Sequence, residues 1–310
     1  MRVIVTNYTR FVRFAWLLLV PLMLPVTLPA ADLTIDHVTV AGKDLKAMQA
    51  TLAALGIPTE YGGPHSNHAT EMALTSFSDG SYLELIAIQP NADPAAVAAH
   101  YWSKQMQNDA GPSAWAVRPK DLTAEVKRLQ AAGVVVTSPA RAGRARPDGV
   151  GLEWETANVG KEPNGTFFPF MIRDFTPREQ RAYPSGKPTT QDFSGVARVV
   201  IAVRDLNASI QRYREAYDLP MPVQQEDQRF GARLASFLGT PVVFATPLNA
   251  QSWLAGRLDK IGEGPCAFIL RLQAPAQNAK KYRLTSQATW FGIETSWLNT
   301  GKMGWWLGFE

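Results

Sequence analysis

Cysteine is almost absent from this chain, which has Cys266 as its only cysteine among 310 residues. One cysteine cannot form an internal disulfide, so no disulfide framework supports the fold. Cys266 lies in the apolar run CAFIL, where we expect a buried side chain that packs as a small hydrophobe.

Motifs of several common enzyme classes are also missing. The sequence contains no G-x-S-x-G, H-E-x-x-H, phosphate-loop or dinucleotide fingerprint, so the signatures of those enzyme classes are absent. It also has no basic stripe with interleaved aromatic residues. That absence argues against nucleic acid as a partner.

Positive charge is concentrated at the N-terminus. The whole chain has 31 Lys and Arg against 27 Asp and Glu, a formal charge of +4. Residues 1–30 hold three of these arginines and no acid, so the remaining chain has 28 against 27, a charge of +1. The basic pI therefore says little about the partners of the mature protein.

The N-terminal charges precede the apolar run FAWLLLVPLMLPVTL, which ends in the small residues Ala30 and Ala31. This order predicts a secretory signal peptide over residues 1–30, and hence a periplasmic or secreted mature protein of a bacterium. A run of about 15 residues, broken by two prolines, is short for a membrane span, which needs about 20. We therefore expect no stable span after cleavage, with an uncleaved anchor as the alternative.

A recurring unit follows the leader. In the first copy, the strand pattern TIDHVTVAG precedes the helical pattern DLKAMQATLAALG, and TEMALTSF and YLELIAI then read as a hairpin. Similar units begin at SAWAVRP and VARVVIAV, and a weaker fourth begins at CAFILRL. The segment RAGRARPDG of the second copy reads as a loop, because it is rich in arginine and glycine and contains Pro-Asp-Gly.

The repeats predict an α+β fold of tandem βαβββ units that pair into two modules, because one copy would leave an open curved sheet. The predicted boundaries are a first module over residues 34–176 and a divergent second module over residues 194–310. The segment PREQRAYPSGKPTTQD has no helical or strand period, which indicates a linker over residues 177–193.

Strand alternation predicts which side chains share a face. In the first strand, Val38 and Val40 are expected to face the helix, which leaves Ile35, His37 and Thr39 on the concave face. In YLELIAI, Leu83, Leu85 and Ala87 take the helix face, and Tyr82, Glu84, Ile86 and Ile88 take the concave face. His37 and Glu84 are therefore expected to lie on one surface.

The chain resembles the vicinal oxygen chelate superfamily, and residues 34–176 resemble its glyoxalase-like branch. The resemblance is carried by IDHVTVAGKDL, GGPH with Thr70 after it, DGSYLELIA, RARPDG, LEW and FPFMIRDF. It implies βαβββ units paired into a cup, with metal ligands from His or Gln on a first strand and Glu on a last strand. His37 and Glu84 match those two positions.

Several positions depart from that family pattern. Alignment of the Asp-Leu pair that opens each helix places Ala114 and Arg198 where the first unit has His37. The loop motif usually has a glycine before its threonine and an asparagine two residues after it, where this chain has Ala69 and Met72. Glu310 lies on the last strand without a matching histidine, and we expect an exposed end there.

A third metal ligand, if there is one, is expected from the loop histidines His65 and His68. The predicted set is His37, Glu84 and His68, with His65 as the other choice, and iron, manganese or zinc suits such donors. The opposing interpretation is that the loop histidines are solvated and that His37 and Glu84 form a metal-free pair. Such a pair can serve as general acid and base or orient a polar ligand.

Anion-binding and aromatic residues complete the predicted site. Arg144 and Arg146, with Arg141 near them, are candidates for recognising a carboxylate or phosphate, the alternative being a solvated loop. Trp154 and Phe170 are expected to form apolar walls, and Thr70, His65 and His68 to contact the ligand. Near the C-terminus Trp290, Trp297, Trp305 and Trp306 are read as core, with a binding wall as the alternative.

Two functions follow from this set of residues. The first is an exported protein that binds a small oxygen-rich or anionic molecule in its cup without a complete metal site. The second is a metal-dependent lyase, isomerase or ring-cleaving dioxygenase in which His37 and Glu84 are the catalytic pair. In both cases the partner is a small molecule, and the sequence allows a homodimer without indicating one.

Overall fold

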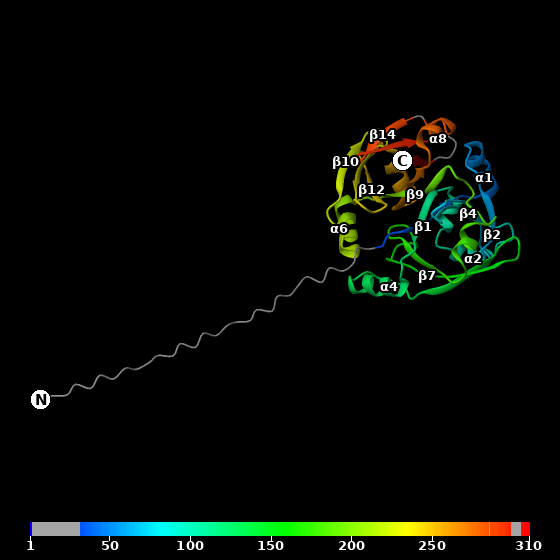
Figure 1. Ribbon diagram of the computed structural model, residues 1–310, viewed down its shortest axis with the longest axis horizontal. Helices are drawn as coiled ribbons and strands as arrows, with labels where there is room; N and C mark the ends of the chain where they lie inside the picture. Colours follow the sequence, from blue (N-terminus) through cyan, green and yellow to red (C-terminus); the bar gives the residue numbers. More distant parts are fainter. Residues whose placement is uncertain (2–31, 285, 299–304) are drawn as a thin grey trace.

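The computed structural model describes Met1 and residues 32–284, 286–298 and 305–310 (Figure 1). The predicted signal peptide therefore lies outside the described residues, and its cleavage stays a prediction. No helix in the described part of the chain is long and apolar enough to cross a membrane.

Eight strands of the first two units form one curved sheet in the order β2-β3-β4-β1-β5-β8-β7-β6. Helices α1 (Leu45–Ala54) and α4 (Leu122–Ala131) each follow the first strand of a unit. The strands are β1 (Ile35–Ala41), β2 (Glu60–Pro64), β3 (Thr70–Ser76), β4 (Tyr82–Ile88), β5 (Gly111–Val117), β6 (Ala140–Ala145), β7 (Gly151–Ala157) and β8 (Phe170–Asp174).

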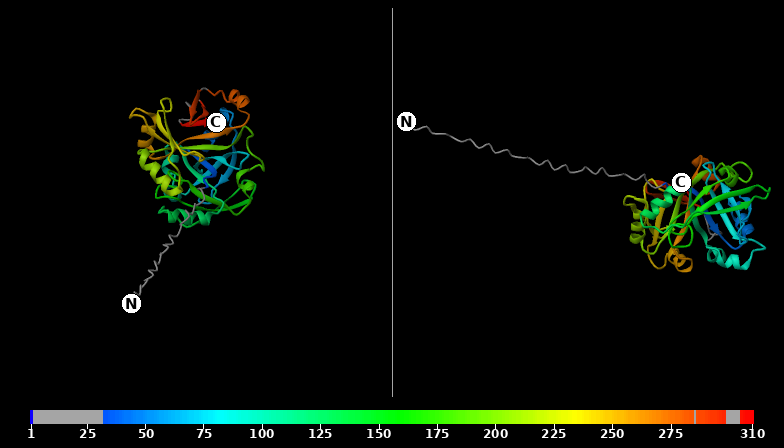
Figure 2. Two further views of the ribbon diagram at one scale, coloured as in Figure 1. Left: turned by 60° about the vertical axis from the view of Figure 1, so that its left-hand side comes forward. Right: turned by 90° about the horizontal axis from the view of Figure 1, so that it is seen from below.

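The third and fourth units repeat this arrangement in a second sheet of order β10-β11-β12-β9-β13-β16-β15-β14. Its helices are α6 (Leu206–Tyr217) and α8 (Pro275–Lys281). The strands are β9 (Phe193–Ala202), β10 (Val223–Asp227), β11 (Ala232–Ser236), β12 (Val242–Pro247), β13 (Gly264–Leu272), β14 (Ser286–Trp290), β15 (Ile293–Trp297) and β16 (Trp306–Phe309). Figure 2 shows the two modules side by side, and the predicted tandem fold is confirmed.

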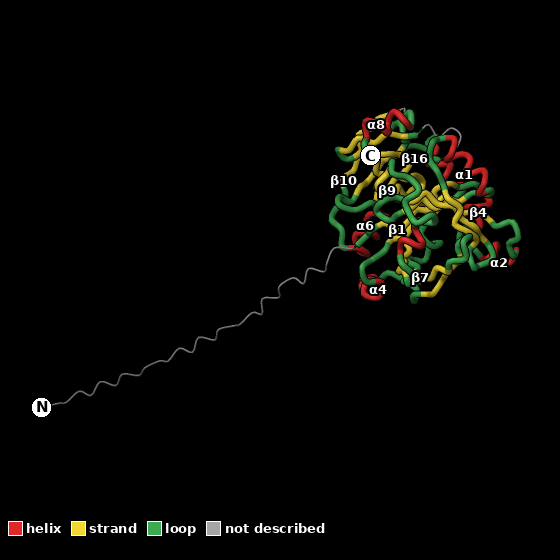
Figure 3. The backbone as a smooth tube through the Cα atoms, turned by 45° about the vertical axis from the view of Figure 1, so that its right-hand side comes forward, coloured by secondary structure: helices red, strands yellow, loops and turns green. Residues whose placement is uncertain are grey.

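The repeated Asp-Leu pair starts three of the helices in the same way. The side chains of Asp44, Asp121 and Asp205 accept hydrogen bonds from backbone N–H groups three residues later, at 2.9 to 3.0 Å. An N-cap of this kind stabilises a helix by about 1 kcal/mol. The helices lie at the outside of the sheets (Figure 3), so the concave faces form two cups, called here the first cup and the second cup.

The faces predicted from strand alternation are correct in β1 except at the start of the strand. Val38 and Val40 pack in the core on the helix side, as do Leu83, Leu85 and Ala87 of β4. The expectation for Ile35 is wrong, because Ile35 packs in that same core. The pairing of β1 with β5 shifts between Ile35 and His37, which makes Asp36 the extra residue of a bulge. A bulge interrupts the period of two, so the residues before it change face.

Three of the four edge strands in the two described sheets carried little signal in the sequence. β6 occupies residues predicted as a loop, and β2 and β10 lie in stretches for which no strand was predicted. An edge strand pairs on one side only and tolerates glycine and charge, so it lacks the alternation of a buried strand. The loop interpretation of RAGRARPDG is therefore wrong for Ala140–Ala145.

Four further helices lie between the repeated parts. α2 (Pro94–Ala99) and α3 (Ser103–Gln107) connect β4 with β5, and α7 (Trp253–Lys260) connects β12 with β13. α5 (Arg178–Ala182) lies within the segment predicted as a linker without helical structure. The arginines of α5 reach the first cup, as described below.

An aromatic cluster of described residues occupies much of the second cup. Phe230, Trp290 and Trp297 are buried there, and Trp253 of α7 and Trp306 pack against them. Ring centroids of neighbouring pairs lie 5.1 to 5.9 Å apart. The interpretation of the C-terminal tryptophans as core therefore holds, and Trp305 belongs to a separate cluster that includes residues of both modules. Cys266 is buried as well, as expected.

Truncation of Trp290 tests whether the second cup is a packed core. Trp290 is 0% exposed, and Trp290→Ala should lower the free energy of unfolding by about 3–5 kcal/mol, the usual cost of such a cavity. Ile293 pairs with it across the hairpin and is 42% exposed, so Ile293→Ala should change stability by about 0.5 kcal/mol or less. Urea denaturation measures both, and equal effects would contradict the packing described.

Candidate functional site

The first cup contains a cavity of about 190 Å³. Its wall is formed by β1, β4 and β6–β8, by the loop before β3 and by the segment that joins α2 to α3. Polar members of the wall include His37, His65, Glu84, His100 and Arg144. The cavity therefore joins titratable groups from five separate parts of the chain.

His37 and Glu84, the two residues singled out by strand alternation, meet in this cavity. β1 and β4 are adjacent and parallel, with His37 beside Tyr82 and Thr39 beside Glu84. His37 Nε2 lies 3.8 Å from Glu84 Oε2, and Thr39 donates to that same oxygen at 2.9 Å. A separation of 3.8 Å is too long for a direct hydrogen bond. A polar group of a ligand can fit between the two side chains.

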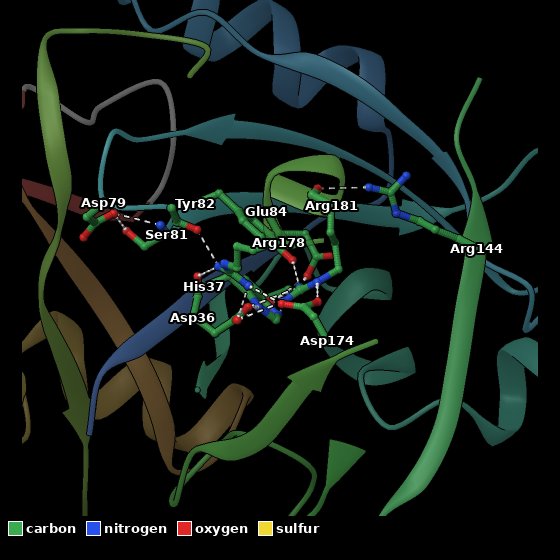
Figure 4. A network of polar contacts seen from close by, with 12 residues as sticks. Asp36, His37, Asp79, Ser81, Tyr82, Glu84, Arg144, Asp174, Arg178 and Arg181 are labelled. Atoms are coloured by element: carbon green, nitrogen blue, oxygen red, sulfur yellow. Dashed lines mark hydrogen bonds and ion pairs between the residues drawn. The ribbon is translucent and has the colours of Figure 1, made fainter. Parts of the chain in front are cut away.

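Asp36, which the sequence analysis did not single out, holds the other side of the His37 ring. His37 Nδ1 lies 2.6 Å from Asp36 Oδ1, and Asp36 is fully buried (Figure 4). Burial alone would raise the pKa of this carboxyl. The guanidiniums of Arg181 and Arg178, together with His37, hold that pKa well below its usual value. Because an ionised carboxylate only accepts, His37 Nδ1 is the donor, and Nε2 is the ring nitrogen on the side of Glu84.

Both arginines come from α5, within the segment predicted as a linker. Arg181 donates to Asp36 Oδ2 at 2.8 Å and to the Tyr82 hydroxyl at 2.6 Å, and Arg178 also contacts Asp36 (Figure 4). Asp174, at the end of β8, is a second acceptor for both guanidiniums. No local pattern marks these arginines, because their acceptor Asp36 lies more than 140 residues earlier.

The two loop histidines have different positions. His65 Nε2 lies 3.8 Å from Glu84 Oε1, and its Nδ1 contacts the Thr70 hydroxyl at 2.9 Å. Burial lowers the pKa of His65 from 6.5 to about 4, opposed by the Glu84 carboxylate and assisted by Arg144. His68 is exposed, has a φ of 56° and does not line the cavity. Of the two loop histidines, His65 therefore lies near Glu84, and His68, the first choice for a third ligand, does not.

His100 is the fourth histidine of the chain, and the sequence analysis did not select it. It follows α2 directly and lines the cavity with Tyr101 and Trp102. Burial lowers the pKa of His100, and the Glu84 carboxylate opposes that shift. His100 lies between two short helices, and no motif in the sequence marks it as a site residue.

The three candidate arginines also differ. Arg144 is 5% exposed, lines the cavity, and donates to the backbone oxygens of Gly62 and, at 3.4 Å, Arg181 (Figure 4). Among the described residues, no carboxylate lies within ion-pair distance of Arg144. Arg146 instead pairs with Asp148, and Arg141 with Glu153, both outside the cavity lining.

Aromatic rings form much of the remaining wall. Trp154 and Phe170 line the cavity, where the sequence analysis expected walls. Tyr82 stacks on the His37 ring with centroids 4.8 Å apart, and Phe170 contacts it edge-on at 5.4 Å. These rings restrict the orientation of His37 and leave a flat, apolar surface beside the polar groups.

The donor set does not fit a metal ion as it stands. Ligands about 2.1 Å from a tetrahedral metal lie about 3.4 Å from one another, whereas Glu84 lies 3.8 Å from each of the histidines His37 and His65. Among the described residues, no group of three His, Cys, Asp or Glu side chains has an arrangement that holds a metal. The guanidinium of Arg144 in the same wall would also repel a cation.

In the second module, Arg198 takes the place of His37, as the alignment of helix starts predicted. Arg198 Nε lies 2.6 Å from Glu310 Oε2, and both side chains are about 10% exposed. The expectation that Glu310 is an exposed end is therefore wrong. β16 carries Glu310 to the neighbourhood of β9 through β13, a contact that the sequence alone does not indicate.

Residues 35–219 match the family described as glyoxalase-like domain. The chain belongs to this family. The match covers more than half of the chain and extends from the first module into the third unit. No curated protein matches the chain.

Solved structures share the glyoxalase-like fold at low sequence identity. A hypothetical protein from Staphylococcus aureus aligns with a TM-score of 0.60 and 15% identity, over 89% of this chain and 98% of the other. A mutant of 4-hydroxymandelate synthase from Streptomyces coelicolor aligns with a TM-score of 0.56 and 10% identity, over 89% and 91%. Methylmalonyl-CoA epimerase from Mycobacterium tuberculosis has 20% identity and a TM-score of 0.33, over 39% and 89%.

The low pKa of His65 predicts acid sensitivity of the glyoxalase-like module. Between pH 6.5 and about 4 the unfolded chain binds a proton at this residue and the folded chain does not, so stability falls as the pH falls through this window. Urea denaturation across the window should show a smaller loss for His65→Gln than for the wild type. His68→Gln, in the same loop but exposed, is the control and should behave as the wild type. Identical slopes for His65→Gln and the wild type would contradict the burial of a neutral His65.

Proposed function

We propose that this glyoxalase-like protein binds a small, oxygen-rich anion in the first cup, and that it does so without a metal. The observation that carries the proposal is Arg144. Its guanidinium is buried in the cavity wall and contacts only backbone carbonyl oxygens of described residues. Burial lowers the pKa of Arg144, but an arginine keeps its charge in a protein.

A buried charge without a partner costs several kcal/mol. The other two buried arginines of the described residues have carboxylate partners: Arg181, in the same cup, contacts Asp36 and Asp174, and Arg198, in the second module, contacts Glu310. The difference supports a role for Arg144 in binding an anion that comes from outside the chain. A carboxylate suits it best, because a guanidinium forks onto two oxygens.

A second candidate function is proton transfer to or from the bound anion by His37. The contact between Asp36 and His37 Nδ1 favours it, because such a carboxylate fixes the tautomer and leaves Nε2 as a base. The metal-dependent lyase, isomerase or dioxygenase stays the remaining alternative. It requires His37, His65 and Glu84 to move closer together than they are here.

We also propose export, since the first 30 residues have the charge and apolar pattern of a signal peptide. The mature chain should begin at or near Ala31 or Asp32. N-terminal sequencing of protein from the native host tests this, and an intact Met1 in the membrane fraction would show an anchor instead.

Benzoate is a suitable probe of the anion site because it combines a carboxylate with a ring of the size of the cavity. Calorimetry should show benzoate binding to the wild type, and Arg144→Met should weaken it at least about tenfold, the value of a lost charge-assisted hydrogen bond. Arg141→Met, on the same strand but paired with Glu153 at the surface, is the matched control.

Two further arms make the benzoate experiment decisive. Arg144→Lys keeps the charge and should retain more affinity for benzoate than Arg144→Met. This comparison separates the effect of the charge from that of a folding defect. Thermal melts check the fold of each variant. Binding should be unchanged after EDTA treatment. Equal affinity of Arg144→Met and the wild type would refute the anion site, and loss of binding after EDTA would favour the metal-dependent alternative.

A further inference from the structure

The end of the first cup opposite Arg144 is lined by hydrogen-bond acceptors. His37 Nε2 is an acceptor in the neutral ring because Nδ1 faces the Asp36 carboxylate. Glu84 contributes two carboxylate oxygens, of which Oε2 accepts from Thr39. A ligand group that lies beside these acceptors should therefore be a hydrogen-bond donor.

The spacing of these acceptors suits a hydroxyl group. His37 Nε2 and Glu84 Oε2 lie 3.8 Å apart, so a hydroxyl placed near the pair can reach either atom at about 2.8 Å, an ordinary hydrogen-bond length. Such a hydroxyl would donate to one of the two. Figure 4 shows Arg144 on the far side of Arg181 and Glu84 from His37, so the anionic group and the hydroxyl must be separate parts of the ligand.

The remaining wall of the cavity indicates which kind of molecular framework joins the anionic group and the hydroxyl of the ligand. Tyr82, Trp102, Trp154 and Phe170 present aromatic rings to the cavity. The volume of about 190 Å³ is close to that of an apolar cavity of about 150 Å³ that binds benzene. A single planar ring therefore fits the space and can stack on the walls.

We infer that the ligand is a small aromatic hydroxy acid, with its carboxylate at Arg144, its ring between the aromatic walls and its hydroxyl between His37 and Glu84. The inference rests on the proposed function and extends it from any small anion to one chemical class. It assigns Glu84 and His37 to recognition of the hydroxyl, a role that requires no metal.

The test compares benzoate with its three hydroxylated forms by calorimetry near neutral pH. The meta or para isomer should bind roughly 3- to 10-fold more tightly than benzoate, the value of one added hydrogen bond. The ortho isomer should show no gain, because its hydroxyl is adjacent to the carboxylate held by Arg144. Phenol, which lacks the carboxylate, should bind more weakly than benzoate.

Variants of Glu84 and His37 show whether the gain in affinity from a hydroxyl depends on these acceptors. At least one of Glu84→Gln and His37→Gln should reduce the meta or para preference, taken as the ratio of the two affinities within the same variant, to about twofold or less. Glu71→Gln, on the adjacent β3 and outside the cavity lining, is the matched control and should keep the preference.

The outcomes separate this inference from the proposed function. Benzoate binding that depends on Arg144, with no gain from any hydroxyl, would overturn the inference and leave the anion site intact. A gain that persists in both Glu84→Gln and His37→Gln would overturn it as well. If neither benzoate nor its hydroxylated forms bind, both proposals fail together.

Discussion

The structure of the first cup depends on one buried carboxylate. Asp36 is the extra residue of a bulge in β1, and its two oxygens receive Arg178, Arg181 and His37. An isolated ionised carboxylate could not be buried in this way, and loss of one partner of a buried ion pair costs about 3–5 kcal/mol. The same contacts attach α5 to the sheet, fix the His37 ring and direct its free nitrogen into the cavity. Fold and site are thus stabilised by a single set of interactions.

The two modules show how one fold can serve two purposes. Both have a sheet of eight strands in the same order, but tryptophan and phenylalanine fill the second cup, and Arg198 is neutralised there by Glu310. The first cup keeps a cavity, and Arg144 in its wall has no carboxylate partner among the described residues. Apolar side chains that fill a cup increase the free energy of unfolding of the module. An open cup with a buried charge lowers that free energy. These differences are the reason why we propose the first cup as the ligand site.

Local patterns in the sequence predicted much of the fold and part of this site. Alternation placed His37 and Glu84 on one face, and the repeated Asp-Leu pair located three helix starts, because both signals act within a few residues. Asp36 was not predicted as a site residue, because a bulge breaks the alternation at its position. Arg178 and Arg181 were not predicted either, because their partner Asp36 is distant in sequence. His100 and Glu310 gain their surroundings only when separate units assemble. Arg144 was selected for its charge, but its burial on an edge strand was not expected from an arginine-rich segment.

The central claim is that an anion binds in the first cup at Arg144 and that the second cup admits none. A crystal structure of the mature chain with para-bromobenzoate tests it most directly, because the bromine can be located by its anomalous scattering. We expect the bromine inside the first cup, with the carboxylate on Arg144 and no anomalous peak in the second cup. A bromobenzoate bound in the second cup, or a first cup in which a metal bridges His37, His65 and Glu84, would contradict the account.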